Sequence, residues 1–128
     1  MEKYMRTPLG RVRGLGSARS GTEHFWLQRL TAVANVPLVI GFLVIFVALV
    51  GRSHAAVVAT IGQPAVAILF IAMLLSVILH MRIGMQVIIE DYVHHEGAKI
   101  ALLMANTFFS IGVGLASAFA VFRISFGL

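Results

Sequence analysis

The chain has 128 residues, of which 59% are hydrophobic and only 12% are charged, and its formal net charge is +5. A soluble domain of this size would expose a continuous apolar surface, so the composition excludes a soluble globular protein and indicates an integral membrane protein. Because the chain contains no cysteine, it offers no thiolate ligands, and any metal must be held by histidine, methionine, carboxylates or a cofactor.

Residues 1–29 form a basic segment. It is too polar to span a bilayer and lacks the apolar core of a signal peptide. Its six cations are Lys3, Arg6, Arg11, Arg13, Arg19 and Arg29. We expect a cytoplasmic arm, disordered by itself, whose charges set the topology of the chain rather than dock a partner, and we expect no nucleic-acid partner.

Three apolar stretches follow, at about residues 30–50, 65–89 and 98–122. Each contains the roughly 20 residues that a helix needs to cross a bilayer, and a helix satisfies its own backbone inside lipid. Pro64 suits the first turn of the second helix, and Pro37 predicts a kink within the first. The sequence therefore predicts an all-α membrane protein whose residues 30–128 form a domain of three transmembrane helices.

The cations near the ends of these spans predict the orientation of the chain. The basic arm and Lys99 lie on one side of the membrane, whereas Arg52 and Arg123 lie on the other. Because cytoplasmic loops carry the excess of lysine and arginine, we expect the N-terminus inside and the C-terminus outside. Asp91 and Tyr92 then lie at the inner membrane surface.

His80 lies within the second span, where an ionisable side chain costs a few kcal/mol unless it is paired or ligated. Gly84 follows one turn later and leaves room for a flat group, and Ser76 lies one turn earlier, placed to hydrogen-bond the imidazole. This pattern suits an axial haem ligand, with Arg29 as a cation for the haem propionates. We expect Arg82, on the other side of the helix, to extend towards the inner headgroups. The alternatives are a helix–helix hydrogen bond for His80 and small-residue packing for Gly84.

The other four histidines fall at or beyond the span ends, so a second axial ligand would have to come from another chain. Asp91 lies on the same face as His80, within roughly 20° and about 16 Å along the helix. A carboxylate and the phenol of Tyr92 at the inner surface suit hydrogen bonding to a quinone carbonyl and proton delivery during its reduction. Plain anchoring of Tyr92 in the interface is the alternative.

The stretch from His80 to Tyr92, with Gly84 and Asp91 at their spacings, resembles the second-helix signature of the D-type membrane anchors of succinate dehydrogenase, respiratory complex II. Arg29-Leu-Thr-Ala resembles that family's Arg-x-Thr-Ala pattern. The resemblance implies that His80 is an axial ligand of haem b, whose other ligand comes from a C-type cytochrome b anchor subunit. It also implies that Arg29 lies near the propionates and that Tyr92, with Asp91 beside it, binds ubiquinone.

The same resemblance implies partner subunits on the inner face. A flavoprotein with FAD and an iron–sulfur subunit with Fe–S clusters would oxidise succinate there, and this chain would not be catalytic alone. We expect a bacterial inner membrane rather than a mitochondrial one, because the N-terminus lacks an Arg/Ser-rich amphipathic helix. The alternatives are a fumarate reductase or haem-free anchor, a small transport or proton-conducting subunit with His80 as relay, and a purely structural anchor that tolerates apolar residues at His80 and Tyr92.

Overall fold

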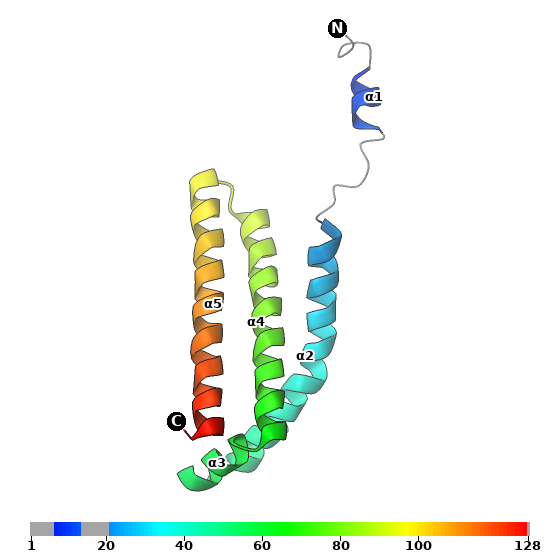
Figure 1. Ribbon diagram of the computed structural model, residues 1–128. Coiled ribbons are helices and arrows are strands. Elements are labelled where there is room, and N and C mark those ends of the chain that lie inside the picture. The colour runs from blue at the N-terminus through cyan, green and yellow to red at the C-terminus, as the bar shows by residue number, and fades with distance from the viewer. Residues whose placement is uncertain (1–6, 14–20, 128) are drawn as a thin grey trace.

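The computed structural model describes residues 7–13 and 21–127 (Figure 1). Lys3, Arg6 and Arg19 of the expected arm lie outside these residues. Within the arm, the short helix α1 spans Pro8–Val12. It begins with a proline at its first position, and the Thr7 hydroxyl accepts a hydrogen bond from the Gly10 N–H at 3.1 Å.

Three long helices dominate the described residues: α2 at Gly21–Leu49, α4 at Pro64–Tyr92 and α5 at Glu96–Phe126. All three are long and apolar enough to cross a membrane. The expectation of an all-α membrane protein with three spans is confirmed. Helix α2 begins at Gly21, whereas the expected span begins at Leu30, so the last residues of the expected arm are helical. The reason is that hydropathy marks the part of a helix that fits lipid, not the point where the helix ends.

The connection between α2 and α4 holds a short helix, α3, at His54–Ile61, which the sequence analysis did not predict. Gly51 takes a positive φ of 76° just after α2. The Ser53 side chain then accepts a hydrogen bond from the Ala56 N–H at 3.4 Å and caps α3. Pro64 opens α4 as expected. Eight residues are too few to cross a bilayer, so α3 is a connector.

The three long helices stand in a row with α4 in the middle, packed against α2 on one side and α5 on the other (Figure 1). The second half of α2 leans beneath the start of α4. Pro37, which has no N–H to donate, lies inside α2 and accounts for this bend.

Small residues and aromatic rings make the closest helix contacts. A Cβ at Gly41 on α2 would lie 2.9 Å from Leu69 Cδ1 on α4, and the rings of Phe42 and Phe70 lie 5.2 Å apart between centroids. The hydrophobic core is small, and many large apolar side chains of the long helices are exposed. The core residues are Phe70, Ile83, Ile89 and Val121. Side chains exposed in this way are those expected to meet lipid or other subunits.

Candidate functional site

His80 of α4 faces α2. Its Nδ1 atom lies 3.2 Å from the hydroxyl oxygen of Thr31 and 3.2 Å from the main-chain carbonyl oxygen of Gln28. Thr31 is only 6% exposed. The imidazole is therefore held by one turn of the neighbouring helix, and both of its contacts from α2 converge on a single ring nitrogen.

The hydrogen-bond partners assign the imidazole proton. The Thr31 hydroxyl lies 2.7 Å from the Leu27 carbonyl and 3.1 Å from that of Gln28, so these carbonyls take its single proton. A carbonyl can only accept, and the hydroxyl has then only lone pairs left for His80. Both neighbours of Nδ1 are acceptors, so Nδ1 carries the proton, and in the neutral imidazole Nε2 then carries the lone pair. This tautomer leaves Nε2 able to bind a metal.

Ser76 does not hydrogen-bond His80, and that expectation was wrong. Its hydroxyl instead donates to the main-chain carbonyl of Thr31 at 3.3 Å, and the residue is 9% exposed. Ser76 and His80 lie one turn apart on the same face of α4, so both face α2 and take their partners there. The bond still serves the site, because it fixes Thr31 relative to α4.

Gly84 also faces α2. A Cβ at this position would lie 3.4 Å from Nε2 of Gln28, which is ordinary van der Waals contact. Within this chain the glycine thus borders the side chain of Gln28 rather than a second helix backbone. The Gln28 Oε1 atom is buried and has no hydrogen-bond partner among the described residues. An orphaned amide oxygen beside Gly84 marks a place where a further polar group would be stabilised.

Arg29 is not brought next to His80 by this chain. Its guanidinium carbon lies 3.6 Å from the centre of the Phe25 ring, and the residue is exposed. Arg29 and Thr31 are two positions apart, about 200° around α2, so Arg29 points away from the contact between α2 and α4. It faces the region that other subunits or lipid would occupy.

Asp91 and Tyr92 end α4, and both side chains are exposed. Tyr92 is 77% exposed. One turn earlier, the Gln86 side-chain amide donates to the Glu90 carboxylate at 2.8 Å. The phenol and the carboxylate are thus presented to the surroundings at the end of the helix and are free of contacts that would bury them.

A second polar contact joins α4 to α5. The Asn106 side-chain amide donates to the main-chain carbonyl of Arg82 at 2.9 Å, and Ser110, which is 0% exposed, donates to the Asn106 carbonyl at 2.7 Å. The Nε atom of Arg82 is buried without a hydrogen-bond partner in the described part of the chain. At least this part of the Arg82 guanidinium is therefore covered.

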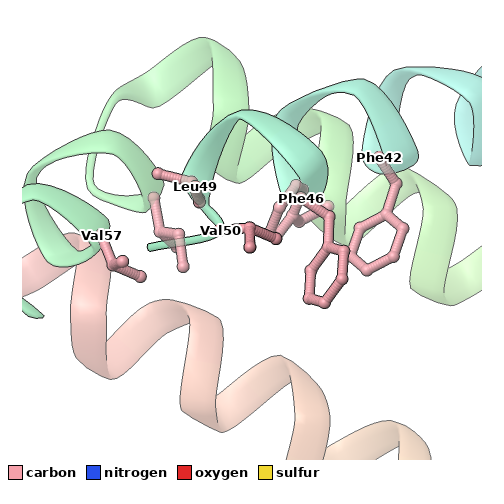
Figure 2. Close-up of a pocket in the computed structure, with 7 residues that line it drawn as sticks. Phe42, Phe46, Leu49, Val50 and Val57 are labelled. Carbon is pink, nitrogen blue, oxygen red and sulfur yellow. The ribbon is translucent and has the colours of Figure 1, made fainter. Parts of the chain in front are cut away.

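The described residues could ligate a haem iron but could not hold a bare metal ion. Residues 7–13 and 21–127 contain no group of three histidine, aspartate or glutamate side chains placed to hold a metal. His80 offers one nitrogen, which suffices for a haem because the porphyrin supplies four more. A hollow of about 300 Å³ between α2, α3 and α4 is lined by hydrocarbon side chains and offers no ligand (Figure 2). The candidate ligand site is therefore at His80 and not in this hollow.

Comparison with known sequences decides the family. Residues 3–114 match the family described as "Succinate dehydrogenase/Fumarate reductase transmembrane subunit". The chain belongs to this family. The chain is 29% identical to the succinate dehydrogenase hydrophobic membrane anchor subunit of Paracoccus denitrificans, over 94% of this chain and 93% of the relative. It is 30% identical to the subunit of that name from Rickettsia bellii, over 91% and 94% of the two chains.

A third relative, the succinate dehydrogenase membrane anchor subunit of Reclinomonas americana, is 36% identical over 64% of this chain and 71% of its own length. No solved structure matches. Gln28 and Thr31, like His80, fall within the region that matches this transmembrane subunit family. Sequence reasoning missed the contacts of both with His80. Their spacing of three residues places them on one helix face, but it does not show that this face meets α4.

Proposed function

We propose that this chain is a membrane-anchor subunit of succinate dehydrogenase, which holds the flavoprotein and iron–sulfur subunits at the membrane and helps a second anchor chain bind haem b and ubiquinone. The names of the three relatives support the anchor role. The observation that carries the haem proposal is the orientation of His80, whose Nδ1 is engaged by α2 while Nε2 keeps its lone pair.

His80 would be one axial ligand, and a histidine of the second anchor chain the other. Haem b, when bound, supplies reversible one-electron chemistry at its iron. The part played by this chain is to hold the ligating nitrogen on a rigid helix pair and to exclude water with apolar side chains. The buried Oε1 atom of Gln28, which has no partner among the described residues, and the absence of a side chain at Gly84 support a further group on this side of α4. Arg29, which is exposed and whose guanidinium lies over the Phe25 ring, would pair with a propionate.

Tyr92 and Asp91 would serve the quinone. The phenol donates a hydrogen bond to a quinone carbonyl, and the carboxylate beside it passes protons from water during reduction. The 77% exposure of Tyr92 supports this role, because the described residues leave most of this side chain uncovered. Electrons would arrive from the iron–sulfur subunit docked on the same membrane surface.

A proton-conducting role for His80 has less support. Polar side chains at the contact between α2 and α4 include Gln28, Thr31, Ser76 and His80, and Asn35, whose Oδ1 atom is buried, follows Thr31 by four positions on the same face of α2. Further along the same contact, the helices meet through Gly41 and Leu69 and through two phenylalanine rings. A proton relay needs hydrogen-bonding groups or water along its whole length. This polar stretch ends part-way and so fits a ligand site better than a conduit.

We further propose that the N-terminus lies inside and that the membrane is a bacterial inner membrane. The excess of cations on the N-terminal side supports the orientation. The relatives from Paracoccus denitrificans and Rickettsia bellii support the bacterial setting. The family description covers fumarate reductase as well, so an anchor of that enzyme is the second candidate.

Purification through a tag on this chain tests the proposal. We expect three further chains to co-purify, namely a flavoprotein, an iron–sulfur protein and a second membrane anchor, together with a low-spin b-type haem spectrum. The purified complex should reduce quinone with succinate faster than it oxidises quinol with fumarate. A chain that purifies without these partners would overturn the anchor role, and a complex without a Soret band would overturn the haem assignment alone.

A further inference from the structure

We propose that Thr31 is the positioning residue of the haem ligand: its hydroxyl oxygen accepts the Nδ1–H of His80, which directs Nε2 to the iron and lowers the redox potential of the haem. The inference rests on the proposed function, because it requires that His80 ligate haem. It adds a residue from another helix that would act through His80 and not on the iron itself.

Thr31 is fixed on both sides of the contact. Its hydroxyl bonds back to the carbonyls of Leu27 and Gln28, at 2.7 and 3.1 Å, and its own carbonyl accepts the Ser76 hydroxyl of α4 at 3.3 Å. With 6% of its surface exposed, the side chain has no freedom to turn towards solvent. The oxygen that faces His80 at 3.2 Å is therefore a preorganised acceptor.

The consequence for a bound iron follows from electrostatics. Two oxygen acceptors around one N–H, those of Thr31 and Gln28, draw its proton outward and leave more electron density on Nε2. A more basic axial imidazole stabilises the oxidised iron over the reduced iron, which lowers the reduction potential. Without the hydroxyl, the carbonyl of Gln28 remains as the single acceptor. The potential should then rise while the iron keeps its ligand.

A hydrogen bond from a hydroxyl to a carbonyl of its own helix does not by itself involve His80, so it should not change the haem potential. Thr60 of α3 also donates to the carbonyl four residues earlier, at 2.8 Å, and Ser125 of α5 does the same at 2.8 Å. Among the described residues, Thr31 is the one whose hydroxyl both bonds to its own helix and contacts a histidine ring of another helix. Thr60 therefore provides a matched control with the same local bond and no contact with His80.

The experiment is a redox titration of the haem absorbance in the purified whole complex. Thr31→Val keeps the shape of the side chain and removes the hydroxyl, Thr31→Ala removes it with less bulk, and Thr31→Ser restores it. We expect Thr31→Val and Thr31→Ala to raise the midpoint potential, Thr31→Ser to return it towards that of the parent, and Thr60→Val to leave it unchanged. The low-spin spectrum should persist in each variant that retains haem.

The outcomes separate this inference from the proposed function. Parent potentials in both Thr31→Val and Thr31→Ala would overturn the role of Thr31, even if His80→Leu abolishes the haem signal. A rise with Thr60→Val equal to that with Thr31→Val would overturn it too, since the effect would then be a general loss of stability. Loss of haem from both hydroxyl-free variants, with full retention in Thr31→Ser and Thr60→Val, would support it. If His80→Leu leaves the haem unchanged, the haem assignment within the proposed function fails.

Discussion

Asn106 on α5 donates a hydrogen bond from its side-chain amide to the main-chain carbonyl of Arg82 on α4, at 2.9 Å. A side-chain donor that crosses to a main-chain acceptor joins two helices without depending on the identity of the accepting residue. In a membrane such a bond is one of the few specific attractions between helices, because apolar side chains meet lipid as readily as each other.

We expect Asn106→Leu to weaken the contact between α4 and α5 by about 0.5–1.5 kcal/mol, the net value of one such bond. The loss is limited because the Arg82 carbonyl has a second lone pair for its own helix. The midpoint of thermal unfolding of the purified complex in detergent measures the effect. Asn106→Gln, which keeps an amide, should lose less. An unchanged midpoint in Asn106→Leu would show that other subunits dominate this contact.

The glycines of the long helices predict a graded series of alanine variants. A Cβ at Gly41 would lie 2.9 Å from Leu69 Cδ1, one at Gly114 would lie 3.1 Å from Ile78 Cδ1, and one at Gly112 would meet nothing within 4 Å. Overpacking costs about 1–3 kcal/mol where neighbours resist, towards the lower end here because side-chain ends can turn. The thermal midpoint should therefore be highest for Gly112→Ala, lower for Gly114→Ala and lowest for Gly41→Ala. Equal losses in all three would contradict the packing described for this chain.

His80→Leu should abolish the low-spin b-type haem spectrum, because leucine has no lone pair for iron. The helix should insert as well as before or better, since an ionisable side chain leaves the apolar span. Difference spectra of the purified complex, together with the amount of this chain in the membrane, measure both effects. His54→Leu is the matched control, because His54 is exposed on the short connector helix α3. Retention of the parent spectrum in His80→Leu would reject the ligand assignment.

Tyr92→Phe keeps the ring at the membrane surface and removes one hydrogen bond, worth about 0.5–1.5 kcal/mol and more if charge develops on the quinone oxygen. Succinate:quinone turnover should fall about 2- to 13-fold for that range. Succinate oxidation with a soluble electron acceptor should stay at the parent rate. Asp91→Asn should lower quinone turnover in the same selective way. Full quinone turnover and affinity in Tyr92→Phe would reduce Tyr92 to an interfacial anchor.

Sequence reasoning predicted the three spans because twenty or more apolar residues in a row have few other solutions. It also singled out His80, because an ionisable imidazole within an apolar span is unusual. The partners Thr31 and Gln28 were beyond reach, because their contact depends on how α2 is rotated against α4. A helix that is apolar all round gives little indication of which face meets its neighbour.

Local chemistry explains the other differences. Helix α3 follows from the Ser53 cap and the glycine turn before it, signals that read as a plain loop beside the stronger hydropathy pattern. The bond of Ser76 goes to α2 and not along its own helix, because side chains on one face of α4 meet the opposite helix first. Contacts within one helix can be read from spacing, whereas contacts between helices require the fold.

The length of α4 bears on the depth at which the proposed quinone chemistry at its end would take place. At 29 residues the helix is about 43 Å long, and a tilt of about 20° reduces its span only to about 40 Å. The hydrocarbon layer is about 30 Å thick, so roughly 10 Å of helix, shared between its two ends, must stand among the headgroups. A quinone held by Tyr92 would keep its isoprenoid tail in lipid while its ring rests level with the glycerol esters. Protons would then enter from interfacial water a few ångströms away, and no channel through the subunit would be required.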